Sequence, residues 1–510
     1  MKNTRKLILN TALLTAASFI MQTVTVSYNV YLTNKIGTIG IGLFQLTLTV
    51  YAMAVTFGCA GVKLASTRLN IDLLAKDPGI SLRHSMRLCL SYSLFTSLIV
   101  GAALFAAASP IAEYWLRDPR SCRLLQWLAI GLPFVAVTTA MQGYFTAVRR
   151  VYLCAISQAL EQAVRIACVV VFLGAMLPRG VEYACLGIVY GMVAGQAAVA
   201  VFSFLLLRQS KDMRRRPRPQ DAVSLRALLH IAAPEAAGAC ARSVLLTTEH
   251  LLIPRGFQAS GRSSEEAMRI YGVVHGMALP VLLYPSAVLS SLASLLVPEI
   301  SELRVRGQSE RIDSAAALIL KLSLLYGVFV GGMFYAFAEP LSLQIYGNTD
   351  AARYLQILAP LVPIMYIDMS VDGMLKGLDE QKASMMYNIL DSGICCILVW
   401  LLLPKLAVKG YIIVLYVSEI YNFFFSLRRL LKVTETPRPN VRGVMQPLLC
   451  VACAALIPLG LVKLMRPGAL STSLPWLAGA LLGAALFYFI SLYLIGSIQA
   501  KDIRSLRRAV

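Results

Sequence analysis

Residues 153–177 read LCAISQALEQAVRIACVVVFLGAML, and this segment is the most informative one for the fold. Its length and apolar composition are those of a helix that crosses a membrane. Four polar residues interrupt it, Gln158, Glu161, Gln162 and Arg165, and at 100° per residue they fall within an arc of roughly 100°. Charged side chains inside a bilayer cost roughly 2.5–3.5 kcal/mol each on insertion scales. This face is therefore expected to line a protein interior or a water-filled path.

The composition of the whole chain is that of a polytopic membrane protein. Of its 510 residues, 58% are hydrophobic and 14% are charged, and the mean hydropathy is +0.69. A soluble protein would carry about 25% charged residues. Apolar stretches recur along the chain and predict an all-α fold of about 14 transmembrane helices. They lie near residues 9–33, 39–63, 87–109, 124–147, 153–177, 183–207, 228–253, 270–297, 312–337, 354–375, 383–404, 409–427, 444–462 and 473–495.

The distribution of basic residues predicts the orientation. Of the 47 Lys and Arg residues, 31 lie in alternate loops that include both termini, 13 lie in the opposite loops, and three lie within spans. This asymmetry predicts that both termini are cytoplasmic in a bacterial cell membrane. The net charge of +21 should then face anionic headgroups and not nucleic acid. Residues 1–21 resemble a secretory signal, but the apolar run continues to Tyr31 without a small-residue cleavage site, so an uncleaved first span is expected.

The loops predict two lobes. A basic, proline-containing linker at 208–227 separates an N-terminal six-helix lobe, 1–207, from a C-terminal six-helix lobe, 228–432. Two further helices and a basic tail follow in 433–510. Because six spans return the chain to the same side, the two lobes should be parallel repeats.

A shift of 230 residues supports this duplication. It aligns Leu128–Glu161 with Leu358–Asp391 and places Glu161 on Asp391, so that a carboxylate occupies the same position in the fifth and eleventh spans. The matching residues include a proline pair, Pro133 and Pro363, and a glycine pair, Gly143 and Gly373.

Other spans also carry polar residues that are candidates for a substrate or ion pathway. These are Gln22 and Asn29 in the first span, Glu235 and Arg242 in the seventh, His275 in the eighth, Asp368 in the tenth, and Asn388 and Asp391 in the eleventh. Each has a structural alternative. Glu161 and Arg165 are equally consistent with a salt bridge between helices, and a lone histidine with a packing residue.

Catalytic and metal motifs are not found in the sequence. Gly-Lys never occurs, so there is no phosphate-cradling ATPase loop, and neither His-Glu-x-x-His nor Gly-x-Ser-x-Gly is present. The 11 cysteines lie mostly within spans, and Cys450 and Cys453 are expected to pack in an apolar segment. The chain is therefore expected not to be an enzyme and to need no cofactor or metal, with transport coupled to H⁺, Na⁺, the membrane potential or the substrate gradient.

Local motifs resemble those of the multidrug/oligosaccharidyl-lipid/polysaccharide flippase superfamily, in its polysaccharide biosynthesis and stage V sporulation protein B branch. The similar stretches are Gly37-x-x-Gly40-x-Gly42-x-Phe44-Gln45, Ala155-Ile156-Ser157-Gln158 with Glu161-Gln162-x-x-Arg165, Tyr271-Gly272 through Gly276-Met277-Ala278-Leu279-Pro280 with Pro285-Ser286 and Leu296-Val297-Pro298-Glu299, and Asp372-Gly373-x-x-Lys376-Gly377-Leu378 with Gln381-Lys382.

The resemblance implies a monomeric, lipid II flippase-like exporter of undecaprenyl-pyrophosphate-linked saccharides, working by alternating access. The pyrophosphate would need cations, which Arg165 and Arg242 supply, so replacing either by Gln should abolish export. Many relatives carry arginines in the first span, where this chain has Gln22 and Asn29, so the glycan stays open. The alternatives are a drug or organic-cation antiporter with an acidic cavity and a scaffold that recruits cell-wall enzymes.

Overall fold

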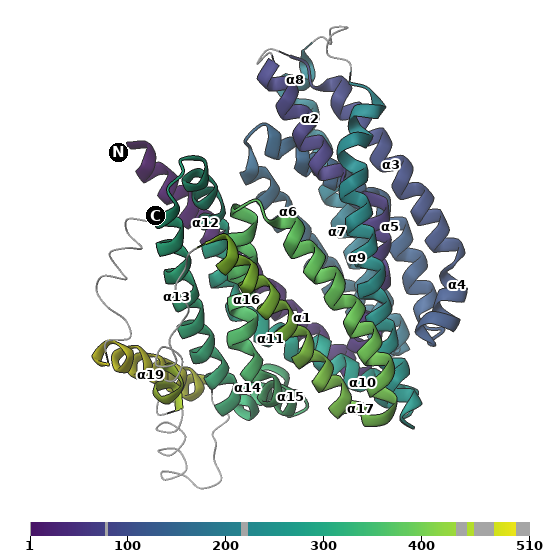
Figure 1. Cartoon of the computed structure of the whole chain (residues 1–510). Helices are drawn as coiled ribbons and strands as arrows, with labels where there is room; N and C mark the ends of the chain where they lie inside the picture. The colour runs from purple at the N-terminus through teal and green to yellow at the C-terminus, as the bar shows by residue number, and fades with distance from the viewer. Residues whose placement is uncertain (1, 77–79, 216–222, 435–445, 453–473, 496–510) are drawn as a thin grey trace. The chain divides into compact units, whose positions relative to one another are not determined.

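A computed structural model describes residues 2–76, 80–215, 223–434, 446–452 and 474–495 (Figure 1). Every regular element in these ranges is a helix, and none of them contains a strand, which confirms the all-α fold. The helices are α1 (Lys2–Cys59), α2 (Val62–Lys76), α3 (Arg83–Ala106), α4 (Ala108–Pro110), η1 (Ile111–Leu116), α5 (Ser121–Ala147), α6 (Val151–Met176), η2 (Leu177–Arg179), α7 (Val181–Gln209), α8 (Lys211–Arg214), α9 (Leu225–Ala259), α10 (Ser264–Gly272), η4 (Val273–Ala278), α11 (Leu279–Leu283), η5 (Tyr284–Ser286), α12 (Ala287–Val305), α13 (Ser309–Ala336), α14 (Ala338–Tyr346), α15 (Ala352–Leu358), η6 (Ala359–Leu361), α16 (Val362–Gly377), α17 (Gln381–Val433) and α19 (Leu474–Leu494).

Ten helical segments of the described chain are long and apolar enough to cross a membrane. Two of them each hold two predicted spans. α1 continues through a kink at Gly37 (φ 72°), and α17 continues through a kink at Ala407 (φ 49°). The predicted seventh span forms α9 but is less apolar than the others. The predicted thirteenth span, 444–462, lies mostly outside the described residues, so the number 14 stays a prediction.

The helices group into two compact units. Unit 1 contains residues 1–35, 256–263 and 269–510, and unit 2 contains residues 36–255 and 264–268. The first half of α1 thus groups with the C-terminal helices, and most of α9 groups with the N-terminal helices. The predicted lobe boundaries at 208–227 stay a prediction, because this grouping rests on contacts and not on the duplication.

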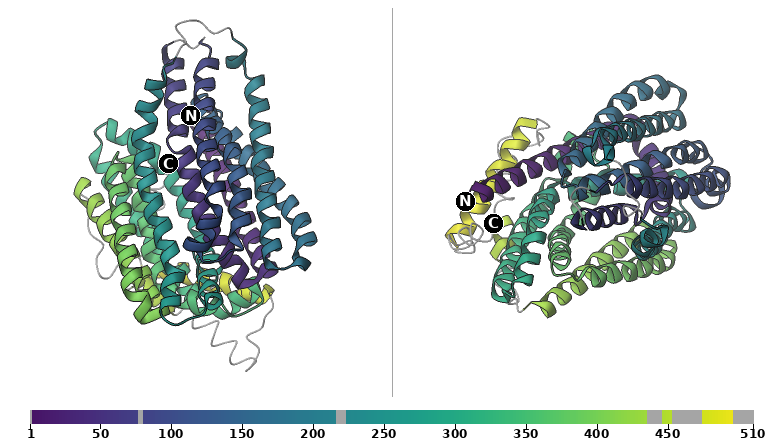
Figure 2. Two further views of the ribbon diagram at one scale, coloured as in Figure 1. Left: turned by 90° about the vertical axis from the view of Figure 1, so that its right-hand side faces the viewer. Right: turned by 90° about the horizontal axis from the view of Figure 1, so that it is seen from above.

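In unit 2, a line of glycines on α7 allows α6 to pack closely. Gly187, Gly191 and Gly195 recur every four residues and so share one face of α7. A Cβ on Gly191 would lie 2.9 Å from the backbone nitrogen of Val169, and one on Gly195 would lie 3.0 Å from the carbonyl oxygen of Glu161. Figure 2 shows the helices of this unit running side by side in both views. The polar stretch of α6 is therefore fixed by close backbone contact.

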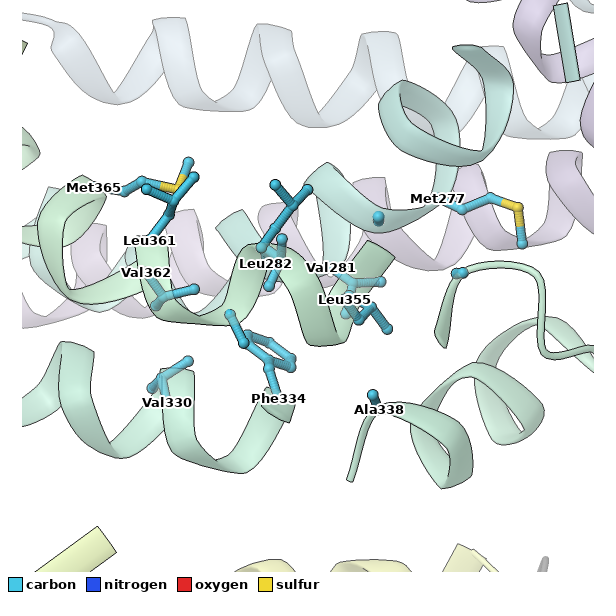
Figure 3. Close-up of a cluster of buried hydrophobic side chains, with 14 of the residues drawn as sticks. Met277, Val281, Leu282, Val330, Phe334, Ala338, Leu355, Leu361, Val362 and Met365 are labelled. Atoms are coloured by element: carbon cyan, nitrogen blue, oxygen red, sulfur yellow. The ribbon is translucent and has the colours of Figure 1, made fainter. Parts of the chain in front are cut away.

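The apolar core of unit 1 joins η4, α11, α13, α15 and α16. Figure 3 shows Val330 and Phe334 of α13 facing Val362 of α16 and Leu282 of α11. The buried hydroxyl of Tyr346 donates to the carbonyl of Met277 at 3.0 Å. Burial raises the pKa of that phenol, so it stays a neutral donor. A second cluster packs Tyr488 of α19 against Leu325 of α13.

The turns after α5 and α16 have the same backbone conformation at the 230-residue shift. Arg149 (φ 57°) and Asp379 (φ 58°) both adopt the left-handed region. The following amides, of Arg150 and Glu380, donate to carbonyls five residues back, each at 2.8 Å, which is the hydrogen bond of a Schellman helix end. Duplication is therefore visible in the backbone within each unit.

The turns that precede α5 and α15 repeat in the same way. Arg117 (φ 54°) corresponds to Gly347 (φ 70°). The next side chain in each turn accepts from the amide two residues on: Asp118 from Arg120 at 3.0 Å, and Asn348 from Asp350 at 3.1 Å. The Arg120 guanidinium also forks onto Asp118, which raises the pKa of Arg120.

Candidate functional site

The polar face of α6 forms a compact network in unit 2. Arg165 pairs with Glu161 one helical turn away, and its second terminal nitrogen donates to Gln162 Oε1 at 3.4 Å. The side chains of Arg165 and Glu161 are 22% and 24% exposed, and Gln162 is buried. Gln158, the fourth predicted member, is exposed. Three of the four residues expected on this face are thus brought together.

Two residues that the sequence did not single out lie beside this network. The hydroxyl of Tyr51 in α1 donates to Gln196 Oε1 in α7 at 3.3 Å, and both groups are buried. Glu161 and Arg165 act electrostatically on that phenol. Gln196 directly follows the glycine line of α7, a pattern that could have identified it.

The network has hydrogen-bond donors left over. Neither Gln162 Nε2 nor Arg165 Nε has an acceptor among the described residues, although both atoms are buried. An unpartnered buried donor costs about 1–3 kcal/mol. Because the charge of Arg165 is matched by Glu161, the unit 2 site offers donors but little net charge.

The predicted pathway residues of α9 also belong to unit 2. Glu235 and Arg242 are both exposed on this helix, and Arg242 has interactions of its own. Their spacing of seven residues keeps them on one face of the helix. Nothing in the structure tests whether they contact cargo.

In unit 1, Asp391 of α17 is held by neutral donors. Its Oδ2 accepts from Ser418 Oγ at 2.9 Å and from Asn422 Nδ2 at 2.8 Å, and Cys395 Sγ lies 3.7 Å from Oδ1. The residue is only 8% exposed. Asn388, one turn before it, donates from its side chain to the carbonyl of Ser384 at 2.8 Å.

Two more carboxylates act on Asp391. Asp368 of α16 and Glu419 of α17 interact electrostatically with each other and with Asp391. Asp368 Oδ1 and Asn422 Oδ1 are buried without a donor among the described residues. Unit 1 thus has surplus acceptors and negative charge. Sequence reasoning missed Glu419, although a carboxylate inside the predicted twelfth span satisfies the rule that selected the other candidates.

The remaining candidates of unit 1 lie on other elements. His275 in η4 bonds to the hydroxyl of Tyr411 at 2.5 Å and packs its ring 4.4 Å from that of Tyr271. Gln22 and Asn29 are half-buried on α1, and the Asn29 carbonyl accepts from Thr33. His275 therefore has aromatic packing partners in Tyr271 and Tyr411.

The repeat therefore gives two carboxylates with opposite surroundings. Glu161 is followed one helical turn later by a cation, Arg165. The residue that corresponds to Arg165 in the other repeat is Cys395, which is neutral and lies one turn after Asp391. The site in unit 2 has surplus donors, and the site in unit 1 has surplus acceptors. A donor site suits oxygen acceptors of a solute, and an acceptor site suits a cation or proton.

Comparisons with known proteins agree with the motifs. A family model described as polysaccharide biosynthesis protein matches residues 7–304, and the MatE model matches residues 264–401. Stage V sporulation protein B of Bacillus subtilis (strain 168) is 25% identical over 407 residues, covering 78% of this chain and 79% of the relative. Sporulation protein YkvU of the same organism is 22% identical over 381 residues, covering 74% and 84%.

Solved structures share the fold. The lipid II flippase MurJ in an inward closed conformation is similar with a TM-score of 0.69 at 12% identity, over 95% of this chain and 98% of that chain. An inward-facing multidrug resistance MATE family transporter gives 0.61 at 16% identity, over 82% and 96%. These proteins are flippases and transporters and not enzymes. Since the polysaccharide biosynthesis model spans more than half of the chain, this protein belongs to that family and is a multi-pass membrane transporter of the multidrug/oligosaccharidyl-lipid/polysaccharide flippase superfamily.

Proposed function

We propose that this protein moves an undecaprenyl-pyrophosphate-linked saccharide, a cell-wall, spore-cortex or other polysaccharide precursor, across the bacterial cell membrane by alternating access. The observation that carries the proposal is the pair of polar sites with opposite chemistry, one in each unit. The family description, the sporulation relatives and the fold shared with MurJ support a lipid-linked saccharide as cargo.

In this proposal the unit 2 site contacts the headgroup of the cargo. Gln162 Nε2 and Arg165 Nε donate to oxygens of the sugar or of the pyrophosphate, which are the acceptors that both atoms otherwise lack. Glu161 orients Arg165 and competes with the phosphate for it. Arg242, exposed on α9, supplies a second cation.

The unit 1 site binds the coupling ion. Asp368, Asp391 and Glu419 cannot all stay charged and close together without a counterion, so a proton or Na⁺ is taken up there. Binding of cargo and binding of the ion then take place on different repeats, and each stabilises a different state of the transporter.

The test is flipping by the purified protein in proteoliposomes. A fluorescent undecaprenyl-pyrophosphate disaccharide is quenched from outside, and the protected fraction reports transport. Arg165→Gln and Arg242→Gln should each slow flipping about tenfold or more, because a charge-assisted hydrogen bond contributes roughly 1.5–3 kcal/mol. Arg306→Gln is the matched control, since Arg306 pairs with Glu302 on an exposed helix end. If Arg165→Gln flips the lipid at the wild-type rate, Arg165 is not part of the headgroup site.

A second candidate, a cation-coupled drug antiporter, is favoured by the MatE match and by the acidic site of unit 1. In that case ethidium, and not the lipid-linked saccharide, would be transported by the same proteoliposomes. Asp391→Asn would then abolish ethidium efflux, and Arg165→Gln would leave it intact.

A further inference from the structure

The turn between α5 and α6 differs in charge from its repeat. Arg149 and Arg150 occupy the positions that Asp379 and Glu380 hold in unit 1, with the same backbone hydrogen bonds. In unit 1 the acidic turn is neutralised internally: Glu380 pairs with Arg429 at 2.7 Å, and Asp379 lies 3.8 Å from Arg304. Equivalent backbone thus carries opposite charge in the two units.

The arginine turn of unit 2 has no such neutralisation. Neither Arg149 nor Arg150 makes an ion pair with a carboxylate in the described part of the chain. Arg150 acts electrostatically on Tyr144, whose hydroxyl lies 3.4 Å from Asp212, but Asp212 already has Arg215 at 3.9 Å. The Arg149 side chain is exposed, and that of Arg150 is half-buried.

A further cation lies near the start of α6. Lys63 of α2 is exposed and acts electrostatically on Cys154, one turn after Arg150. Arg149 and Arg150 directly precede α6, and Lys63 acts on its first turn, whereas Arg215 is paired with Asp212. We call Lys63, Arg149 and Arg150 the inner basic patch.

The backbone of Arg149 strengthens the case for function. A left-handed residue at a helix end is usually Gly or Asn, and an arginine is rarely found there. Asp379, in the equivalent position, is a residue type that tolerates this conformation better. The left-handed backbone of Arg149, together with its lack of an ion-pair partner among the described residues, motivates the hypothesis that its side chain has a role.

We propose that the inner basic patch binds the phosphate headgroup of an anionic phospholipid in the leaflet that the turn faces, predicted to be the cytoplasmic one. Guanidinium groups can donate to the oxygens of a phosphodiester, and Arg149 and Arg150 lie between the end of α5 and the start of α6, where a membrane-spanning helix would reach the headgroups. The bound lipid is distinct from the transported cargo, and unit 1 has no equivalent because its turn is acidic.

Lipid binding to the full-length protein in detergent tests this proposal. Native mass spectrometry measures retention of 1-palmitoyl-2-oleoyl-phosphatidylglycerol against the matching phosphatidylcholine. Arg149→Gln/Arg150→Gln should weaken phosphatidylglycerol binding roughly 20- to 30-fold, which corresponds to about 1 kcal/mol for each basic side chain near an anionic surface. The lysine pair Arg149→Lys/Arg150→Lys should keep most of the binding.

The matched control removes the same charge from unit 1. Arg306→Gln/Arg311→Gln takes two exposed arginines from the predicted cytoplasmic end of α12 and α13 and should leave phosphatidylglycerol binding unchanged. If the double glutamine variant fails to fold, Arg149→Gly replaces it, because glycine suits the left-handed turn. This variant loses one basic side chain and should bind phosphatidylglycerol about five-fold more weakly. Three results would each overturn the proposal. Phosphatidylglycerol binding could fall equally in the two double variants, it could stay unchanged in Arg149→Gln/Arg150→Gln, or that variant could lose binding of the lipid-linked saccharide alone.

Discussion

At the scale of single residues, the main result is that Arg165 is not an isolated charge. Its partner Glu161 lies one turn away on the same helix, so the pair is nearly neutral, and hydrogen-bond donors remain. Because each side chain is about a fifth exposed, the pair should stabilise the protein less than a fully buried one, for which breaking costs 3–5 kcal/mol.

A double-mutant cycle measures this. Glu161→Gln should lower the free energy of unfolding by about 1–2 kcal/mol. The double variant Glu161→Gln/Arg165→Gln should lower it by less than the sum of the two single variants. The difference, which is the coupling energy of the pair, should be at least about 0.5 kcal/mol. The exposed pair Glu302 and Arg306, also four residues apart, should show only about 0.3–0.5 kcal/mol. Equal coupling in both cycles, measured by chemical unfolding in detergent, would show that burial adds nothing to the α6 pair.

At the same scale, the acidic site of unit 1 predicts which variant loses ion coupling. Asp391→Asn keeps the shape of the side chain and its contact with Ser418, but it removes the charge that a proton or Na⁺ would neutralise. In Asp391→Asn, flipping under an imposed pH or Na⁺ gradient should therefore be no faster than flipping measured without a gradient. Asp313→Asn, a half-buried position near the start of α13, is the control and should stay coupled.

At the scale of elements, the glycine line of α7 decides how closely α6 can approach. Gly191→Ala would place its Cβ 2.9 Å from the Val169 backbone nitrogen, which cannot move away as a flexible side chain would. Such overpacking costs about 1–3 kcal/mol. Gly174→Ala on α6 meets nothing within 4 Å and should stabilise by about 0.5–1 kcal/mol through helix propensity. Thermal unfolding in detergent should move in opposite directions for these two variants.

At the scale of the whole molecule, the repeat and the distribution of basic residues together predict membrane sidedness. Asp379 and Thr349 are exposed on opposite ends of the helices α15 and α16. A membrane-impermeant maleimide added to intact cells should label Thr349→Cys and leave Asp379→Cys unlabelled, above the background of the unsubstituted protein. The reverse labelling pattern would place both termini outside.

Apolar length, helix-breaking residues and charge asymmetry are properties of composition and order, so the all-α membrane fold and the 230-residue repeat could be predicted from the sequence, and local motifs resembled those of the superfamily. The sequence also placed Glu161 and Asp391 at equivalent positions. The surroundings of these two carboxylates became visible only in the folded chain. Cys395, Ser418 and Asn422 meet Asp391 because one long helix bends at Ala407, and Tyr51 and Gln196 approach Arg165 because three helices converge. Such contacts depend on distances across the fold, which the periodicity of a single segment does not contain.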